Sequence, residues 1–345
     1  MGLTHNAHRA DNYNDPIVTM TCRKRGAMRQ VHIKNDSTYS GGDLAANIDS
    51  FRRHLAAENL SPRTLKVYTE AARLLEGFLA DRGMPRDVAN IRREHVEAFV
   101  ADQLERLKPA TASNRYRSLR ALFKWLEEEG ELPNGNPMMK MKPPRVPEQP
   151  PDILREDELK ALLKTCEGKD YESRRDHAIL RVFLDTGARV GEVTGIRWDP
   201  DDEENNDLDL DQGLLRILGK GGRWRLVHLG AKCIKALDRY LKLRGRHPHT
   251  DARWLWLGQK GRMTDSGIRQ AVRRRGRQAG FAKQLYPHLL RHSFAHAWLH
   301  AGGGETDLMR VAGWRSRQML ERYGASAAQE RSLTAAKRLA LGDRI

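Results

Sequence analysis

The chain has 345 residues, 39% of them hydrophobic and 31% charged, and is long enough for two domains with packed cores. Lysine and arginine number 61 against 45 acidic residues, which gives a formal net charge of +16 and a pI near 10. A folded chain this basic favours nucleic acid as its partner, ahead of an anionic membrane surface. The sequence has neither a signal peptide nor a run of ~20 apolar residues, so it predicts no membrane span. Its three cysteines form no CxxC pair, which argues against a disulfide scaffold or a zinc ribbon and favours a reducing, cytoplasmic setting.

The first third of the chain divides into a polar tail and a helical region. Residues 1–42 are polar and aperiodic, and we expect a flexible basic tail. Residues 43–133 repeat apolar positions at helical spacing and predict a four-helix domain. Ser61-Pro62 predicts one helix start, Gly83 its end, and Thr111 the cap of the fourth helix. The predicted buried positions are Ile48, Phe51, Leu55, Leu65, Tyr68, Leu75, Phe78, Leu79, Val96, Phe99, Val100, Leu104, Leu107, Tyr116, Leu119, Phe123 and Leu126.

The fourth of these helices carries a second, basic face. Arg117, Arg120 and Lys124 recur at helical spacing, and Arg115 lies just before them. Such a face is often only solvated, but in a chain this basic, contact with DNA phosphates is an equally good interpretation. These four residues are therefore candidates for DNA binding.

Residues 134–152 are rich in proline and basic residues and predict a linker, because proline interrupts a helix. The second domain is predicted over residues 153–345. Its predicted elements are helices near 156–163 and 174–184, a hairpin over 214–229 with a Gly-rich turn at 219–222, a helix from 234, an apolar strand at 254–257, a very basic helix at 269–277 and an amphipathic segment at 333–341. Within the basic helix, Arg273 and Arg274 are further candidates for DNA contact.

Two glycine-containing segments resemble ligand-binding loops but fail the chemical requirements. The acidic run at 199–211 lacks the geometry of a calcium loop, since Gly213 comes one place late and Leu218 stands where the last carboxylate belongs. An exposed loop that enters the hairpin is the better interpretation. The turn at 219–222 is too short for a P-loop.

Four histidines, His288, His292, His296 and His300, are spaced by four and would align on one helix. A zinc ion needs three or four convergent ligands, whereas one straight helix offers two neighbouring donors at a time. The sequence therefore predicts neither a metal nor a cofactor.

Five remaining residues, Arg189, Lys220, His288, Arg291 and Tyr323, could together cleave a phosphodiester. Two arginines can grip a phosphate through paired donors and neutralise the charge that grows in a pentacovalent transition state. A tyrosine can attack that phosphate, but its ordinary pKa near 10 requires a proton acceptor or a positive field. A histidine can accept the proton, and a mobile lysine on a hairpin turn can protonate the departing sugar oxygen. This chemistry requires no metal and no nucleotide.

In their order and spacing these motifs resemble the tyrosine recombinases, or phage-type integrases, over roughly residues 43–340. The matching segments are Thr186-Gly-Ala-Arg189-Val-Gly-Glu192, Gly219-Lys220-Gly221, Pro287-His288-Leu-Leu-Arg291-His292-Ser-Phe and Ala312-Gly313-Trp314, with Tyr323 nine residues after the tryptophan. The resemblance implies a mainly α fold with a small β-sheet. An N-terminal four-helix, SAM-like core-binding domain would precede an α+β catalytic domain.

The resemblance also implies roles for the site residues. These are phosphate clamping for Arg189 and Arg291, general-acid catalysis at the 5′-oxygen for Lys220, acid–base catalysis for His288, and nucleophilic attack for Tyr323. Arg223 lies close to Lys220 on the same hairpin, which makes the lysine assignment the weakest of the five.

Two further residues have supporting roles by the same resemblance. Trp314 falls where the family usually has histidine and sometimes tryptophan; its indole N–H can donate to a phosphate oxygen but cannot exchange protons at neutral pH. Glu192 matches a supporting acidic position.

The implied function is that of a site-specific DNA recombinase working through a 3′-phosphotyrosine intermediate, in integration, excision or replicon resolution. The implied partners are double-stranded DNA with a specific core site and further copies of the chain, as a homotetramer on paired sites in which a C-terminal helix docks on a neighbour. The setting would be the cytoplasm, at the nucleoid. A type IB topoisomerase-like enzyme and a non-catalytic DNA-binding protein are the alternatives. The four-helix domain and C-terminal segment disfavour the first, and the intact set of five residues disfavours the second.

Overall fold

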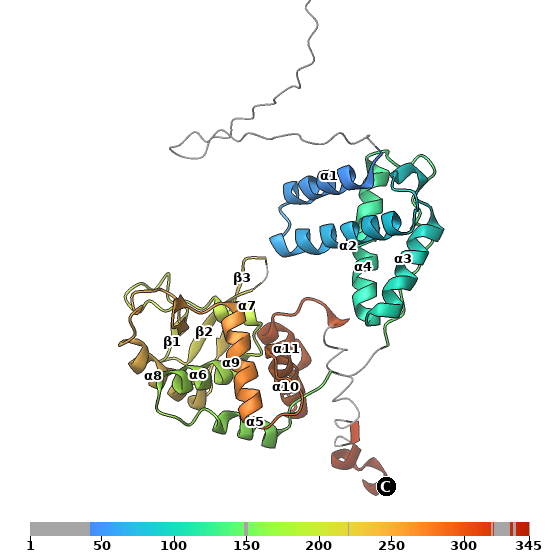
Figure 1. Ribbon diagram of the computed structural model, residues 1–345. Helices are drawn as coiled ribbons and strands as arrows, with labels where there is room; N and C mark the ends of the chain where they lie inside the picture. The colour runs from blue at the N-terminus through green and yellow to red at the C-terminus, as the bar shows by residue number, and fades with distance from the viewer. Residues whose placement is uncertain are drawn as a thin grey trace, which may run out of the picture. The chain divides into compact units, whose positions relative to one another are not determined.

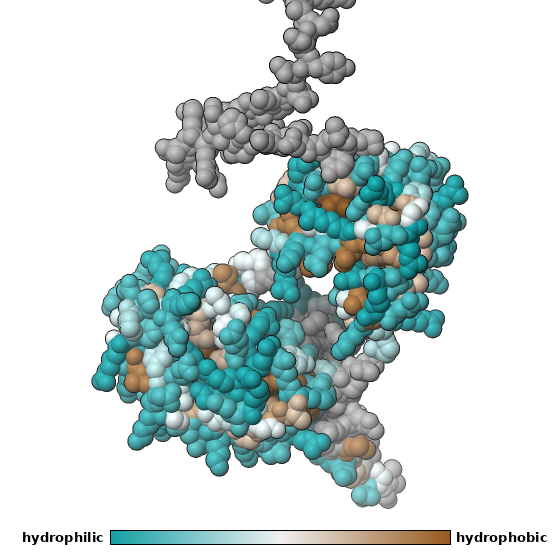
Figure 2. Space-filling view, viewed as in Figure 1, coloured by the Kyte–Doolittle hydropathy of each residue, from teal (hydrophilic) through white to brown (hydrophobic). Residues whose placement is uncertain are grey.

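The computed structural model describes residues 42–147, 151–219, 221–318, 320, 332–333 and 336–344 (Figure 1). The chain divides into two compact units, with the boundary between residues 148 and 149. In the view of Figure 2 the surfaces of both units are mainly hydrophilic. Within the described ranges no helix is long and apolar enough to cross a membrane.

The first unit is a bundle of four helices and one short 3-10 turn. Its elements are α1 (Leu44–Ala57), α2 (Pro62–Asp81), η1 (Val88–Asn90), α3 (Arg93–Arg106) and α4 (Pro109–Glu128). The Ser61 side chain accepts from Thr64 N at 3.2 Å and begins α2, as predicted. The prediction for Thr111 is wrong, because α4 begins two residues earlier at Pro109, whose ring presets the first helical φ angle.

Most predicted stripes face the core of this unit, but α3 departs from the pattern. Leu104 is 40% exposed and Leu107 lies beyond the helix end, whereas Gln103 is buried. The Gln103 side chain accepts a hydrogen bond from Arg115 of α4. The contact between α3 and α4 at this point is therefore a polar pair instead of the predicted apolar one. The spacing of apolar residues does not reveal such a pair.

The start of the Pro-rich segment packs onto this bundle. Met138 and Met141 are buried in its core, and Tyr116 donates from its hydroxyl to the Met141 carbonyl at 2.7 Å. The chain therefore stays anchored to the bundle from the end of α4 at Glu128 as far as Met141, through side-chain burial rather than helix.

The second unit is built around α6, which packs against α8, α9 and α10. Its elements are α5 (Glu156–Lys164), α6 (Tyr171–Thr186), α7 (Val190–Thr194), β1 (Leu208–Asp209), β2 (Leu214–Gly219), β3 (Arg223–His228), α8 (Ala231–Arg244), β4 (Leu257–Gly258), β5 (Gly261–Arg262), α9 (Asp265–Gln278), α10 (Pro287–His300), α11 (Glu305–Ala312) and η2 (Leu341–Arg344). Figure 1 shows the helices gathered around the strands of this unit. The arrangement confirms the predicted mainly α fold with a small β-sheet.

Strands β1, β2 and β3 form an antiparallel sheet in chain order, and β4 pairs with β5. In the β2–β3 hairpin Ile217 pairs with Arg225 and Gly219 pairs with Arg223. The buried side chains Leu215, Ile217 and Val227 define its inner face. By the same register Arg225 lies on that inner face.

Two predictions for this unit are wrong. In the stretch predicted as a strand at 254–257 only Leu257 belongs to β4, although Leu255 and Trp256 are buried; burial, rather than sheet pairing, explains the apolar run. Within the acidic run, Asp207 is buried instead of exposed and binds the guanidinium groups of Arg197 and Arg216. Pairing with two arginines compensates the cost of burying that carboxylate.

Candidate active site

The carbonyl end of α11 gathers three arginines from distant parts of the chain. The hydrogen bonds are Arg225 Nε to Val311 O at 2.8 Å, Arg291 Nη2 to Ala312 O at 2.7 Å and Arg189 Nη2 to Gly313 O at 3.5 Å. The last carbonyls of a helix lack partners within it and carry the negative end of its dipole. Three consecutive carbonyls thus supply both hydrogen-bond acceptors and a favourable field for three cations.

Glu192 joins two of these arginines. Its Oε1 accepts from Arg189 Nη1 at 2.8 Å, and its Oε2 accepts from Arg225 Nη2 at 2.7 Å and from the Arg189 backbone N–H at 2.9 Å. Burial raises the pKa of Glu192, but hydrogen bonds and charge from Arg225 and Arg189 outweigh it, so the pKa lies below the ordinary 4.5. The carboxylate is therefore ionised at neutral pH. It holds one arginine that is 12% exposed, Arg225, and one that is 36% exposed, Arg189.

Arg291 is buried behind this group, with 1% of its surface exposed. It donates to Gly187 O as well as to Ala312 O, and its guanidinium carbon lies 5.3 Å from the centre of the Trp314 ring. Gly187 ends α6 with a positive φ of 55°, and a Cβ there would stand 2.3 Å from Phe294 Cδ1. The turn that leads to Arg189 therefore requires glycine.

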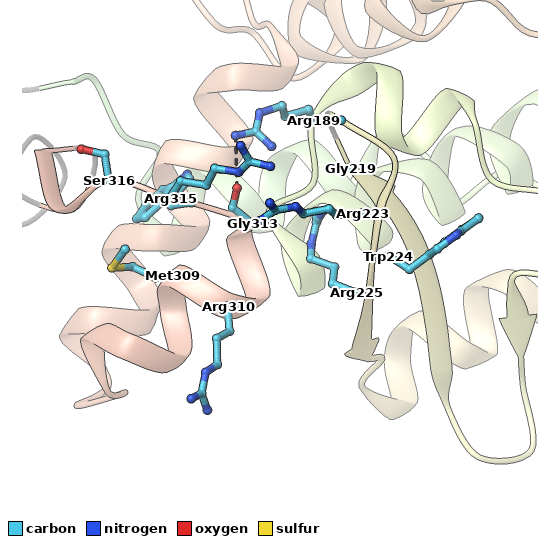
Figure 3. Close-up of a pocket in the computed structure, with 12 residues that line it drawn as sticks. Arg189, Gly219, Arg223, Trp224, Arg225, Met309, Arg310, Gly313, Arg315 and Ser316 are labelled. Carbon is cyan, nitrogen blue, oxygen red and sulfur yellow. Dashed lines mark hydrogen bonds between the residues drawn. The ribbon is translucent and has the colours of Figure 1, made fainter.

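A cavity of about 590 Å³ opens beside this cluster (Figure 3). Its lining residues are Arg189, Gly219, Gly221, Arg223, Trp224, Arg225, Met309, Arg310, Gly313, Trp314, Arg315 and Ser316. Figure 3 marks the contact between Arg189 and Gly313 and shows Arg310 and Trp224 directed away from it. Within the described part of the chain no acidic side chain lines the cavity, so its field favours an anion.

The structure brings four of the predicted site residues together. Arg189 and Trp314 line the cavity, while Glu192 and Arg291 lie behind it and bind the same cluster. His288 is exposed in the first turn of α10, with its ring centre 5.7 Å from that of His292.

The predicted general acid and nucleophile, Lys220 and Tyr323, lie outside the described residues. The neighbours of Lys220, Gly219 and Gly221, both line the cavity. Arg223, the competing basic residue on the hairpin, lines it too.

Sequence reasoning missed Arg225 and Arg315. Arg225 had a local signal: it alternates with Val227 and Leu229 and so occupies the core-facing phase of its strand. A charged residue in that phase indicates a buried partner, which here is Glu192. Arg315 comes directly after the predicted Trp314 and lies within 3.6 Å of the position of a Cβ built on Gly221. Only the packing of α11 against the hairpin reveals that proximity.

The candidates for DNA contact on α4 differ in exposure. Arg117, Arg120 and Lys124 are exposed, and Lys124 pairs with Glu128 at 3.0 Å. Arg115 is half-buried by its bond to Gln103, so its guanidinium contributes to the bundle.

The two candidates on α9 differ in the same way. Arg273 is exposed. Arg274 pairs with the buried Asp176 at 2.7 Å and with Glu172 at 3.2 Å, which neutralises much of its charge within the unit.

Both units of the chain are similar to known proteins. Residues 152–330 match the phage integrase family, and residues 48–130 match the phage integrase N-terminal SAM-like domain. Tyrosine recombinase XerC of Syntrophus aciditrophicus is 31% identical over 293 residues, which cover 81% of this chain and 92% of the relative. The XerC of Xanthomonas campestris pv. campestris strain B100 is 28% identical over 281 residues, covering 80% of this chain and 83% of the relative.

A solved structure extends the similarity to the fold. The XerH site-specific recombinase bound to a palindromic difH substrate superposes with a TM-score of 0.67 at 20% identity, over 85% of this chain and 84% of that chain. Together with the two matched family domains and the curated relatives, these similarities identify the chain. It belongs to the phage integrase family and is a tyrosine-type site-specific recombinase.

Proposed function

We propose that this recombinase exchanges DNA strands at a specific core site through a 3′-phosphotyrosine intermediate, as a homotetramer on paired sites. The observation that carries the proposal is the convergence of Arg189, Arg291 and Trp314 at the carbonyl end of α11, beside a cavity lined by arginines. Such a site suits a scissile phosphate, whose negative charge it would meet with oriented donors.

In the proposed mechanism the two clamp arginines act differently. Arg189 is partly exposed and keeps donors for a phosphate oxygen, since its contact to Gly313 O, at 3.5 Å, is the longest of the three. Arg291 is buried behind the cavity wall, and its hydrogen bonds to Gly187 O and Ala312 O fix the position of its positive charge. Trp314 adds an indole N–H as a further donor.

Tyr323 attacks the phosphorus, so that a bond from its phenolic oxygen to phosphorus forms and the bond from phosphorus to the 5′-oxygen breaks. His288 takes the phenolic proton, and Lys220 protonates the departing 5′-oxygen. Rejoining reverses each step, with the 5′-hydroxyl of another strand as nucleophile. Bond energy is conserved in the phosphotyrosine ester, so the exchange consumes no cofactor.

The two units would divide the work of binding. In this proposal residues 1–42 are a basic tail, residues 43–133 bind the core site through the exposed residues of α4, residues 134–152 link, and residues 153–345 catalyse. The exposed Leu333 and Leu339 support docking of the C-terminal segment on a neighbouring copy. The exposed Arg273 supports a second contact with DNA. In this proposal the recombinase acts in the cytoplasm, at the nucleoid.

Covalent trapping tests this proposal and identifies the DNA core sequence in the same experiment. The protein is incubated with nicked duplex fragments from a genomic library, and covalent complexes are recovered under denaturing conditions and sequenced. We expect adducts on one core sequence with wild type and none with Tyr323→Phe, whose binding to that sequence stays unchanged. Tyr286→Phe, which alters an exposed tyrosine, serves as control.

Three outcomes would change the proposal. An adduct that persists in Tyr323→Phe, or that is lost in Tyr286→Phe, moves the nucleophile. No adduct from wild type on any fragment favours a non-catalytic DNA-binding protein. Supercoil relaxation without recombinants, on a plasmid with two recovered sites, favours the topoisomerase-like alternative.

A further inference from the structure

Arg225 shares one carboxylate with Arg189, and the sharing is asymmetric. Oε2 of Glu192 accepts from Arg225 Nη2 at 2.7 Å and from the Arg189 backbone N–H at 2.9 Å, whereas Oε1 binds the Arg189 side chain through Nη1 at 2.8 Å. The Arg225 Nε is meanwhile bound to Val311 O at 2.8 Å. With 12% exposure against 36% for Arg189, Arg225 is the more deeply anchored of the two.

Two glycines make room for this anchor. A Cβ on Gly313, whose φ is 65°, would stand 3.0 Å from Arg225 Nη1, and a Cβ on Gly219 would stand 3.4 Å from the same atom. The guanidinium of Arg225 therefore lies between the end of β2 and the cap of α11. Both of these backbone segments line the cavity.

An arginine and a carboxylate left to themselves tend to form a bidentate pair through two parallel N–H···O bonds. In its end-on form, such a pair with Glu192 would use both terminal nitrogens of Arg189 and leave neither for a ligand in the cavity. Because Oε2 already accepts from Arg225 and from the Arg189 backbone N–H, the Arg189 side chain makes one bond with the carboxylate. The second terminal nitrogen of Arg189 then stays directed toward Gly313 O at the cavity wall.

We propose that Arg225 is a positioning residue for strand cleavage, which acts through Glu192 to keep one terminal nitrogen of Arg189 available to the scissile phosphate. The inference rests on the proposed function of the site. It differs from a role in the phosphate clamp itself, because its effect is transmitted through Glu192. Removing Glu192 must therefore cancel the requirement for Arg225.

The test measures single-turnover covalent-adduct formation on the trapped core duplex at saturating protein, together with the affinity for that duplex. We expect Arg225→Gln to slow adduct formation about 10- to 100-fold, as a displaced reacting group does, while affinity changes by less than about threefold. The Glu192→Gln and Arg225→Gln double variant should be no slower than the slower single variant. Arg246→Gln, at an exposed site after α8, is the matched control.

Arg225→Lys provides a second route to the same answer. Lysine keeps the positive charge but lacks the planar fork that spans Glu192 and Val311 O. We expect it to fold like wild type by thermal denaturation and still cleave slowly. Should Arg225→Gln not fold, the cycle is run with Arg225→Lys.

The inference is overturned if folded Arg225 variants cleave at the wild-type rate, or if the slowing in the double variant equals the product of the two single effects. Multiplying effects would mean that Arg225 acts on DNA independently of Glu192. Failure of the proposed function looks different, since the wild-type protein would then form no adduct at all.

Discussion

Asp176 and Glu192 are buried carboxylates of the second unit that each bind two or more arginines, but only the Glu192 cluster borders the cavity described above. Asp176 on α6, 1% exposed, pairs with Arg175, Arg274 and Arg275 at 2.7 to 2.9 Å. Arg175 also donates to Leu257 O, and the side chains of Arg175 and Arg275 are 6% and 7% exposed.

The Glu192 cluster has the same ingredients but opens on one side. Arg189 is 36% exposed and lines a cavity, whereas Arg274 of the Asp176 cluster is 37% exposed and does not line it. Gly219, Gly221 and Gly313 form the adjoining wall. The comparison shows that a buried carboxylate bound to arginines does not by itself indicate a functional site, because such a cluster can also serve only to stabilise the fold. What distinguishes the candidate active-site cluster is the cavity that one of its arginines lines.

The largest expected effect is a loss of folding stability when the Asp176 cluster loses its carboxylate. Asp176→Asn should lower the free energy of unfolding by about 3–5 kcal/mol, because buried arginines lose their counter-charge. The midpoint of urea denaturation measures this. Asp238→Asn, which removes an exposed pair with Lys242, should cost less than about 1 kcal/mol. If the two variants lose equal stability, Asp176 is not the structural centre of its cluster.

The next effect is on catalysis. Arg189→Gln should slow adduct formation about 100- to 1,000-fold, as the loss of a donor to transition-state charge does. Its unfolding midpoint should move far less than that of Asp176→Asn, because Arg189 is partly exposed. A variant that cleaves normally would place the phosphate away from this cavity.

A smaller effect tests the turn between α6 and Arg189. Gly187→Ala should lower the unfolding free energy by about 1–3 kcal/mol, from a positive φ and a clash with Phe294. Since Gly187 O binds Arg291, adduct formation should slow as well. Gly77→Ala in α2 has open space around the added methyl group and should instead stabilise by about 0.5–1 kcal/mol.

The smallest effect concerns pH. The pKa of Glu192 is lower in the folded protein than its ordinary 4.5, so its stabilising contribution is present above pH 4.5. It is lost as the pH falls from that value through the folded pKa. The difference in unfolding free energy between wild type and Glu192→Gln should thus stay constant at higher pH and shrink in acid. A difference that grows in acid would contradict the assignment of Glu192 as an ionised anchor.

Local patterns predicted much of the fold. The apolar spacing of Ile48, Phe51 and Leu55 and the Ser61-Pro62 start signal depend on neighbours within a turn or two, and both were confirmed. Asp207 was wrongly expected to be exposed, and the burial of Gln103 was not predicted, because both depend on arginines reached through tertiary packing, namely Arg197, Arg216 and Arg115.

The sequence by itself determined the family motifs, the mainly α architecture and the residues from which the site is drawn, because motif spacing and periodicity are properties of the linear chain. The tertiary structure alone decided which of those residues meet. Arg189, Arg225 and Arg291 converge on three consecutive carbonyls because β3 and α10 pack against α11 and the residue before α7 reaches the end of α11. These guanidinium groups and their carbonyl acceptors are far apart in the sequence, so no local pattern predicts which carbonyl at a helix end each arginine will bind.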